Sequence, residues 1–403
     1  MFNLNFTPPP PQKLFTRLWQ GALVVFLGIM TLFSPTELVA QPDRCGTPFH
    51  TPQPFVRGND RDIARTPNVQ GLITIPVVVH VVYPSSIPAA NISNAQIQSQ
   101  IDIVNEDFRR MNADASNTPL DFTGIAADVE IEFCLASEDP NGLPTNGITR
   151  TMNLMTSEYP LGSNDMKLTS QGGRDGWPPD SYLNVWVCDF EILGRSSSPG
   201  ELSMFPQFDG VIVDYEAFGN IGTAQPPFDL GRTLTHEVGH WLDLVHIWGD
   251  GDCSVDDFIT DTPTQNGSTL PGSVPNCTYP DDNSCIDSGT DFPDMFQNYM
   301  DYSDDACMNL FTLGQKQVMR DLFEPGGIRE SILNSTGCCT PTTCACAAAQ
   351  DLIFNTSGNV IAGTQIINGT IFVEAGGELT VTGTLRFTSN SGIVVRRGGR
   401  LHV

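Results

Sequence analysis

Apolar residues in the first half of the chain follow patterns typical of buried strands. The run ITIPVVVHVVY, which follows Leu72, is rich in β-branched residues and predicts a strand buried in a sheet. Alternating apolar residues at 129–135 predict a half-buried strand, and similar segments lie at 183–190 and 211–215. Because His80 lies inside the first strand, we expect it to be a hydrogen-bonded sheet residue and not a ligand.

Helical periodicity begins after the first strand. Ser93 and Gln96 predict a capping box. The apolar residues that follow have the 4-3-4-3 spacing of one buried helix face: Ile97, Ile101, Val104, Phe108 and Met111. Two more helical segments are predicted, one from about 231 and one over 312–323, with a loop-rich region at 249–294 between them. These elements predict an α+β fold in which a helical segment follows the sheet.

The charge and the cysteine content of the chain limit the classes of function that it can have. The chain has 46 acidic and 20 basic residues, a formal charge of −26, which argues against the basic surface that nucleic-acid binding needs. This balance fits an extracellular protein, a cation-binding protein or one that attracts basic substrates. Eleven cysteines agree with export, since disulfides persist in oxidising compartments. The odd count predicts one thiol without a cysteine partner.

The N-terminal residues 1–40 have the pattern of a secretory signal. Two basic residues precede an apolar run at 21–33, which is shorter than the about 20 residues that a spanning helix needs. Ala40 offers a small residue at the expected cleavage site. Residues 41–65 lack apolar periodicity and predict a pro-segment or linker. We therefore expect a secreted protein without a membrane span in its mature form, either free or associated with the cell surface.

The C-terminal segment 340–403 differs from the rest of the chain. After a Cys-rich linker, segments from Asn368 and Ser391 share the pattern G-x-[IV]-x-V-x-x-G-G-x-L-x-V. Alternating apolar residues with Gly-Gly turns at a fixed period predict a short β-solenoid-like repeat. A solenoid needs about three repeats and a cap, so we expect this tail to be truncated. The remaining span, 66–339, is the predicted catalytic domain.

The string THEVGHWLDLVH, from Thr235 to His246, has the residues of a catalytic zinc site. On a helix, His236 and His240 lie one turn apart on the same face, so two imidazoles can reach one ion. His246 can complete the site if the chain turns back, and three nitrogen ligands leave an open position for water. Glu237 can accept a proton from that zinc-bound water. The sequence therefore predicts a zinc-dependent peptidase.

The strings HEVGHWLDLVHIWGDGDC and QNYMDYSDDACMNLFTLGQ resemble the pappalysin family of metzincin zinc proteases, and the similarity extends to about Cys339. The resemblance implies a two-lobed domain, with a twisted sheet and an active-site helix above an irregular lower lobe. It implies that Met300 lies beneath the metal and that Tyr302 supports the oxyanion. Metzincins usually have Gly where this chain has Asp243, and Asp tolerates left-handed geometry better than most residues.

The resemblance also implies roles for residues outside the zinc motif. Cys45-Gly46 is similar to a pro-segment motif whose thiolate occupies the open zinc position of a latent enzyme; an ordinary disulfide is the alternative. Asp305 matches an acid that shapes the S1′ pocket in relatives that prefer Lys or Arg at P1′, the residue after the cleaved bond. Asp257 and Asp261 lie in an acidic loop where relatives can bind Ca²⁺, and a solvated loop is the alternative.

The cysteine pairs follow partly from the same resemblance. It implies the two disulfides Cys253–Cys285 and Cys277–Cys307. The sequence alone could not select this pairing of the four cysteines. Because Cys134 and Cys188 both lie in candidate strands, we expect that they can pair with each other. The four cysteines at 338–346 are expected to close the end of the domain.

We therefore expect a secreted endopeptidase that acts on proteins or peptides, with Zn²⁺ in its active site, Ca²⁺ as a further metal and a basic P1′ preference. Two alternatives remain open at this point. One is a non-catalytic, zinc-stabilised extracellular binding or adhesion protein. The other is a protease of a different metzincin family. The oligomeric state does not follow from the sequence.

Overall fold

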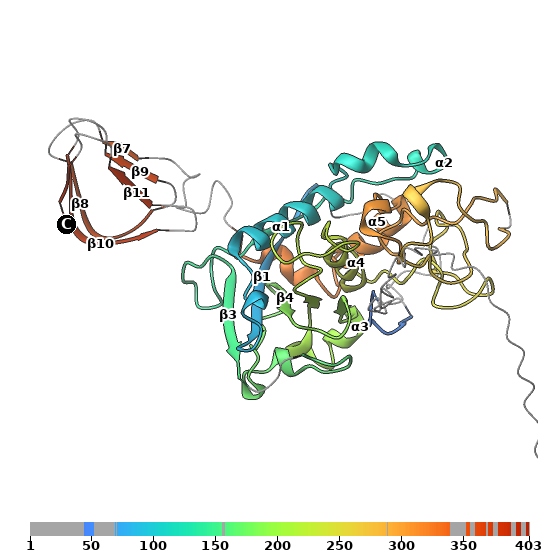
Figure 1. Cartoon of the computed structure of the whole chain (residues 1–403), viewed down its shortest axis with the longest axis horizontal. Helices are drawn as coiled ribbons and strands as arrows, with labels where there is room; N and C mark the ends of the chain where they lie inside the picture. Colours follow the sequence, from blue (N-terminus) through green and yellow to red (C-terminus); the bar gives the residue numbers. More distant parts are fainter. Residues whose placement is uncertain are drawn as a thin grey trace, which may run out of the picture. The chain divides into compact units, whose positions relative to one another are not determined.

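The computed structural model describes residues 44–51, 69, 71–154, 158–287 and 289–338, and the strands of the tail between 352 and 402 (Figure 1). The predicted signal at 1–40 and most of the predicted pro-segment lie outside these residues, as do the cysteines after Cys338. None of the described helices is both long and apolar enough to cross a membrane.

A six-stranded sheet forms the centre of the domain. Its strands are β1 (Ile73–Pro84), β2 (Ile131–Leu135), β3 (Ile148–Asn153), β4 (Leu183–Cys188), β5 (Gly194–Ser196) and β6 (Val211–Asp214). Their order is β2-β1-β4-β6-β5, and β3 also pairs with β1. All pairs are parallel except β5–β6, which is antiparallel and makes β5 an edge strand. The four predicted strands are confirmed, whereas β3 and β5 were not predicted.

Both faces of β1 are buried, which explains its continuous apolar run. Val77 and Val79 belong to a large core that includes apolar residues of the helices. On the opposite face, Val82 packs with Trp186 in a second core. Strands that are covered on both faces do not alternate between apolar and polar residues. His80 is buried within β1 and contacts Thr149 and Asn184 through its ring nitrogens, as expected for a sheet residue.

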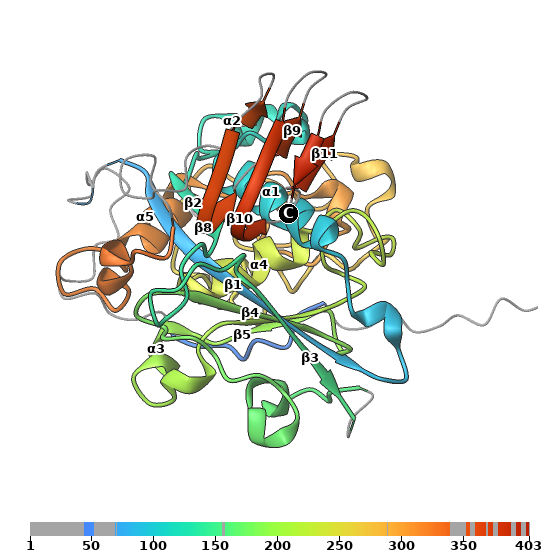
Figure 2. The same ribbon diagram turned by 90° about the vertical axis from the view of Figure 1, so that its left-hand side faces the viewer.

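The helices pack against this sheet or lie in the loops around it. The α-helices of the described residues are α1 (Asn94–Phe108), α2 (Leu120–Thr123), α3 (Pro199–Leu202), α4 (Arg232–Trp241) and α5 (Leu313–Asp321). Short 3₁₀-helices lie at Pro88–Ala90, Ala113–Asn117, Asp165–Lys167, Thr169–Gln171, Pro206–Phe208, Pro275–Cys277, Asp305–Cys307 and Glu330–Asn334. The long helix α1 packs on α4, and both lie on the same side of the sheet (Figure 2).

The ends of the helices follow their capping residues. Ser93 caps α1 as expected, but the predicted capping box does not form, because the side-chain amide of Gln96 donates to the Phe218 carbonyl instead. Thr312 and Gln315 form a capping box at the start of α5. The prediction that Met111 continues the buried face of α1 is wrong, because the helix ends at Phe108. Two residues later Arg110 has a φ of 50°, which turns the chain away and leaves Met111 60% exposed.

The tail contains two three-stranded parallel sheets, with the orders β12-β10-β8 and β11-β9-β7. Its strands are β7 (Leu352–Phe354), β8 (Asn359–Ile367), β9 (Thr370–Val373), β10 (Glu378–Phe387), β11 (Gly392–Val395) and β12 (Arg400–His402). Ile371 pairs with Ile393, and Leu379 pairs with Leu401. Equivalent residues of the sequence repeat therefore lie beside each other, and a solenoid form of this tail stays a prediction.

Candidate active site

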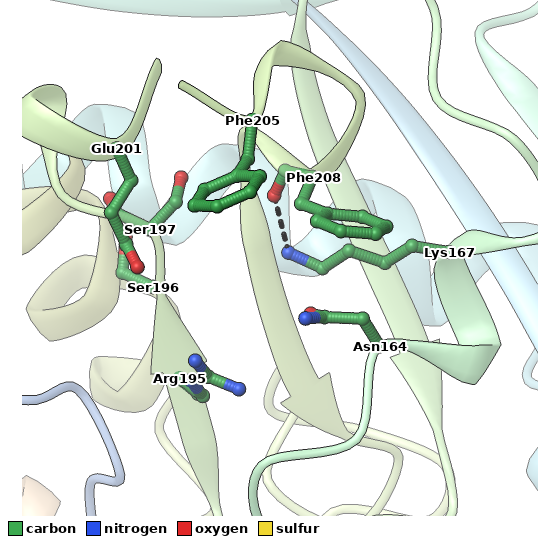
Figure 3. Close-up of a pocket in the computed structure, with 8 residues that line it drawn as sticks. All are labelled: Asn164, Lys167, Arg195, Ser196, Ser197, Glu201, Phe205 and Phe208. Carbon is green, nitrogen blue, oxygen red and sulfur yellow. Dashed lines mark hydrogen bonds between the residues drawn. The ribbon is translucent and has the colours of Figure 1, made fainter. Parts of the chain in front are cut away.

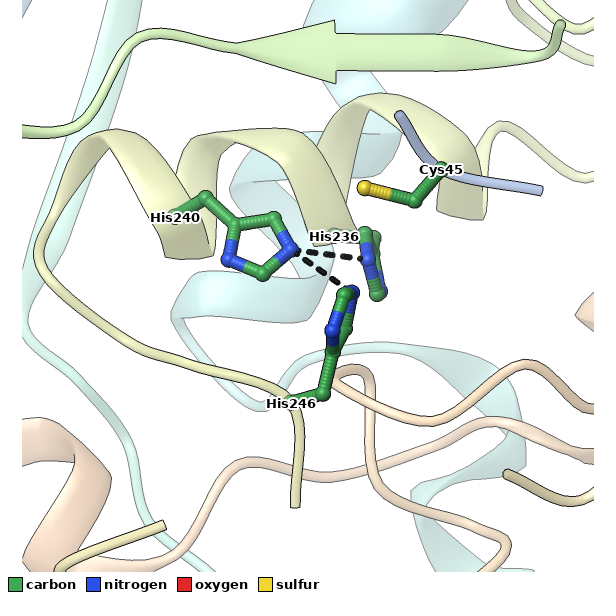
Figure 4. A group of neighbouring side chains, drawn as sticks. All are labelled: Cys45, His236, His240 and His246. Carbon is green, nitrogen blue, oxygen red and sulfur yellow. Dashed lines mark hydrogen bonds between the residues drawn. The ribbon is translucent and has the colours of Figure 1, made fainter. Parts of the chain in front are cut away.

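Three histidine side chains converge at the end of α4 (Figure 4). The Nε2 atom of His240 lies 3.1 Å from Nε2 of His236 and 3.1 Å from Nε2 of His246. The first two residues are one turn apart on α4, and the third comes from the segment that follows the helix. All three side chains are buried.

A turn at Asp243 brings the third histidine back to the helix. Asp243 has a φ of 71°, in the left-handed region, and the next backbone N–H donates to the Gly239 carbonyl at 3.0 Å. Asp is one of the few residues besides Gly that adopt this conformation readily. The turn therefore forms in this chain without the usual glycine.

The second ring nitrogen of each histidine has its own partner. Nδ1 of His236 lies 2.7 Å from the Tyr299 carbonyl, and Nδ1 of His240 lies 2.8 Å from the Leu244 carbonyl. Nδ1 of His246 lies 2.5 Å from a carboxylate oxygen of Asp250. Acceptors at Nδ1 hold the proton there and leave the lone pair of Nε2 directed into the cluster.

The cluster fits a metal ion with nitrogen and sulfur ligands. Burial lowers the pKa values of His236 and His240 well below the ordinary value, so both rings are neutral, which is the form that binds a metal. The thiol of Cys45 joins them, and the four ligand atoms lie within 4.8 Å of one another. Neutral imidazoles with a cysteine are ligands typical of Zn²⁺.

Residues 44–51 lie along β5, where Cys45 forms a parallel bridge with Gly194. The Gly46 N–H donates to the Gly194 carbonyl at 2.9 Å, and the Tyr302 hydroxyl donates to the Cys45 carbonyl at 3.2 Å. The segment thus continues the sheet past its edge strand and holds the thiol over the histidines.

Glu237 lies beside the histidine cluster and is fully buried. Burial raises the pKa of Glu237 to about 7. Its Oε2 accepts a hydrogen bond of 2.8 Å from the hydroxyl of Thr47, and the same hydroxyl accepts a hydrogen bond of 2.7 Å from the Ser196 N–H. The carboxylate therefore has a partner from the segment that carries Cys45.

Asp305 pairs with Arg44, the residue before Cys45. A guanidinium nitrogen of Arg44 lies 2.8 Å from Oδ1 of Asp305, and both side chains are buried. Oδ2 of Asp305 accepts from the backbone N–H groups of Leu230 and Arg232. The Arg44 side chain also lies over the Phe228 ring, at 5.2 Å from its centroid. The two buried charges are therefore paired.

Met300 and Tyr302, from the loop before α5, lie against α4 and the histidine rings. Met300 is buried, and a Cβ at Gly239 of α4 would collide with its sulfur. The ring centroid of Tyr302 lies 5.0 Å from that of His246 and 5.7 Å from that of His236. Glycine at 239 thus lets this loop approach the helix.

The two acidic residues considered for Ca²⁺ do not meet in one cluster. Asp257 accepts from the Ile259 N–H and the Thr262 hydroxyl, whereas Asp261 accepts from Thr312 and the Gly314 N–H. Among the residues that the structure describes, the His–Cys cluster is the only group of three or more metal-ligating side chains. Calcium binding stays a prediction.

The disulfides differ from the expectation at one position. Cys253 pairs with Cys285 and Cys277 with Cys307, which are the pairs implied by the family resemblance. The expected Cys134–Cys188 pair is wrong, because Cys134 pairs with Cys338. Strand β1 lies between β2, which carries Cys134, and β4, which carries Cys188. The Cys188 thiol is buried in the second core instead.

Sequence reasoning missed Arg44 and Thr47. Both flank the Cys45-Gly46 pair, and this proximity was the available signal. Their partners Asp305 and Glu237 lie 261 and 190 residues away in sequence, so no local pattern connects them.

Comparisons with known proteins agree with this geometry. The peptidase M43 family, described as pregnancy-associated plasma protein-A, matches residues 168–324. Mature mirolysin from Tannerella forsythia, solved in complex with a cleaved peptide, is 49% identical, with a TM-score of 0.62 over 66% of this chain and 97% of that chain. The chain belongs to the pappalysin (M43) family of metalloproteases.

Other pappalysin relatives have similar descriptions. A promirolysin point mutant from Tannerella forsythia is 48% identical, with a TM-score of 0.60, and the match covers 66% of this chain and 85% of that chain. An extracellular metalloprotease of Verticillium alfalfae is 28% identical over 73% of this chain and 95% of the relative. One from Pyricularia oryzae is 31% identical over 63% of this chain and 76% of the relative. The pappalysin chain described here is thus a metalloendopeptidase with the metzincin fold.

Proposed function

We propose that this pappalysin is a secreted zinc endopeptidase that prefers Lys or Arg at P1′ and is kept latent by residues 44–51. The observation that carries the proposal is the buried pair of Arg44 and Asp305 beside the histidine cluster. A guanidinium in this position occupies the place that a basic substrate side chain would take. Curated relatives described as extracellular support secretion.

The side chains around the cluster can perform the proton transfers of peptide hydrolysis. Zn²⁺ held by His236, His240 and His246 would polarise the scissile carbonyl and the attacking water. Glu237, with its pKa raised to about 7 by burial, accepts a proton from that water and delivers it to the leaving amine. Tyr302 donates to the Cys45 carbonyl, and this contact supports a role of its hydroxyl in stabilising an oxyanion.

Latency follows from three contacts of one short segment. Cys45 supplies a sulfur ligand where water would enter, Thr47 bonds to Glu237, and Arg44 fills the acidic subsite. Each contact removes a different part of the catalytic apparatus. Full activity therefore requires loss of the whole segment, for which cleavage after it is the simplest route.

A bound Ca²⁺ near Asp257 and Asp261 is the remaining part of the proposal. Burial raises the pKa of both carboxyl groups, and a cation nearby would favour their charged forms. A Ca²⁺ titration monitored by thermal unfolding tests this, with Asp261→Asn as the variant. An unfolding temperature that does not change with Ca²⁺ in the parent protein would rule out the site.

The decisive experiment compares the active enzyme with Glu237→Ala on casein and on a peptide library. We expect cleavage by the parent before Lys or Arg and no cleavage by the variant, which keeps its metal because Glu237 is not a ligand. Equal activity of the two proteins would contradict the proposed mechanism. A library profile without enrichment of Lys or Arg at P1′ would contradict the proposed specificity.

A further inference from the structure

A pocket of about 190 Å³ lies beside the edge strand of the sheet, outside the site described above (Figure 3). Its walls come from β5, the hairpin loop that follows β5, and the segment around the 3₁₀-helix Asp165–Lys167. The lining residues are Asn164, Lys167, Arg195, Ser196, Ser197, Glu201, Phe205 and Phe208. Two basic side chains share this pocket in a chain with 20 basic and 46 acidic residues. Burial lowers the pKa of Lys167 to about 7, so Arg195 is the permanent cation of the pocket.

The two basic side chains keep free donors directed at the pocket. Lys167 is 3% exposed, and its ammonium donates to the Phe208 carbonyl at 2.7 Å while it lies over the Trp186 ring. An ammonium has three donors, so this bond leaves others available. Nη1 of Arg195 is buried without a hydrogen-bond partner among the described residues. A buried guanidinium nitrogen without a partner lacks a compensating acceptor.

The acidic groups nearby are already engaged. Glu201 accepts from the Ser198 N–H in the capping box of α3. Asp209, the next carboxylate along the loop, forms a buried ion pair with Arg329. Neither carboxylate is hydrogen-bonded to Nη1 of Arg195 among the described residues, and an anion is a ligand that would satisfy this donor. Stacked rings of Phe205 and Phe208 form part of its wall, which limits water and strengthens such a contact.

The contacts of residues 44–47 locate this pocket relative to the cleaved bond. Arg44 reaches Asp305, Cys45 joins the metal cluster and Thr47 reaches Ser196, which lines the pocket. Along this one segment, the contact with Asp305 thus comes before Cys45 and the contact with the pocket strand comes after it. If the residue after the cleaved bond binds Asp305, the residues before that bond must run toward the pocket.

We infer that the Lys167–Arg195 pocket is a substrate subsite that binds an Asp or Glu side chain located before the cleaved bond. The inference rests on the proposed function for the direction of the substrate. The preferred substrate would then have an acidic residue before the cleaved bond and a basic residue at P1′. Different residues would determine the two preferences, Asp305 at P1′ and Arg195 before the cleaved bond, so experiments can separate them.

The test uses the active enzyme and pairs of peptides that share Arg at P1′. Each pair has Glu or Gln at one upstream position, and kcat/KM is measured for both members. We expect one position at which the Glu peptide is cleaved about tenfold faster, since a hydrogen-bonded ion pair in a half-buried pocket has about this effect. In Arg195→Gln this ratio should fall toward one, because the variant lacks the permanent positive charge of the pocket.

Two further variants make the result specific. Arg150→Gln, the same substitution at an exposed position on β3, should keep the parent ratio. Arg195→Glu should reverse the preference, so that a Lys peptide is cleaved faster than a Glu peptide. Reversal cannot result from partial unfolding, which lowers cleavage of both peptides alike.

The outcomes separate this inference from the proposed function. A Glu-to-Gln ratio near one at every upstream position, with the P1′ preference intact, would overturn the subsite and leave the proposed specificity. A ratio that Arg195→Gln does not change would also overturn it. Loss of the P1′ preference, with the Arg195-dependent ratio intact, would instead remove the proposed P1′ specificity and retain the subsite.

Discussion

The hydroxyl of Thr47 donates a 2.8 Å hydrogen bond to Oε2 of Glu237, the carboxylate proposed to move the protons of catalysis. Two residues earlier, Cys45 joins the three histidines of the metal cluster. One short segment therefore contacts both the metal ligands and the general base. Substitutions at Cys45 and Thr47 can therefore remove these two inhibitory contacts one at a time.

The first prediction concerns this hydrogen bond. Thr47→Val removes the donor while keeping the side-chain shape, and we expect the precursor to show about tenfold more activity, because a hydrogen bond to a charged group is lost. Thr47→Ser should stay latent, since it keeps the hydroxyl. The measurement is cleavage of a fluorogenic peptide before the segment is removed. If Thr47→Val and Cys45→Ala both remain as latent as the parent, the segment does not act through these contacts.

The second prediction concerns Asp305. Asp305→Asn removes the charge that pairs with Arg44, and we expect kcat/KM for peptides with Arg at P1′ to fall about 100-fold, while peptides with an apolar P1′ residue change little. Asp304→Asn is the matched control, because this neighbouring carboxylate accepts from the Gly272 N–H and is not paired with Arg44. If Asp305→Asn cleaves peptides with Arg at P1′ at the same rate as the parent, another residue determines the P1′ preference.

The third prediction concerns Asp107, which supports a metal ligand from α1. Its carboxylate accepts from Thr235 at 2.6 Å and from the Tyr299 hydroxyl at 3.0 Å, and the Tyr299 carbonyl contacts His236. We expect Asp107→Ala to weaken zinc affinity about 10- to 100-fold, as loss of such supporting contacts typically does. Competition with a chromogenic chelator measures the affinity.

The control for Asp107 lies on the same helix. Asp102 is exposed and accepts from Gln98, so Asp102→Ala should leave zinc affinity unchanged. Circular dichroism would establish that both variants remain folded. Equal zinc affinity of a folded Asp107→Ala protein and the parent would contradict the supporting role.

The fourth prediction concerns the disulfide between Cys134 and Cys338, which are 204 residues apart. Chain-entropy arguments give at most about 5 kcal/mol for a loop of this size. We therefore expect the double variant Cys134→Ser/Cys338→Ser to unfold at a clearly lower temperature. Cys188→Ala, which removes a buried free thiol, should have a smaller effect. Peptide mapping without reduction should recover Cys134 linked to Cys338, and recovery linked to Cys188 would refute the observed pair.

The fifth prediction concerns the metal itself. Removal by a strong chelator should abolish peptide cleavage, and addition of Zn²⁺ should restore it, because His236, His240 and His246 form the only three-histidine cluster in the described part of the chain. Metal analysis of the purified protein should give about one zinc per catalytic domain. A protein that stays fully active after its metal has been removed would contradict the zinc mechanism.

Local patterns predicted much of the scaffold of this protein. The spacing of His236, Glu237 and His240 predicts the ligand face of a helix because the helical period is fixed. Likewise, the apolar run at 73–83 predicts β1, and the helical segment predicted over 312–323 corresponds to α5. Each of these inferences depends on residues within a few turns of one another.

Only the tertiary structure decided which distant residues meet. The pairs Thr47–Glu237, Arg44–Asp305 and Cys134–Cys338 join positions that are 190 to 261 residues apart. The expected Cys134–Cys188 pair failed because strand order, which the sequence did not specify, places β1 between the two cysteines. Side-chain chemistry thus determined which groups could bind a metal or carry a proton. The packing of the sheet, α4 and the segment at 44–51 determined which of them touch, since such contacts depend on the path of the whole chain.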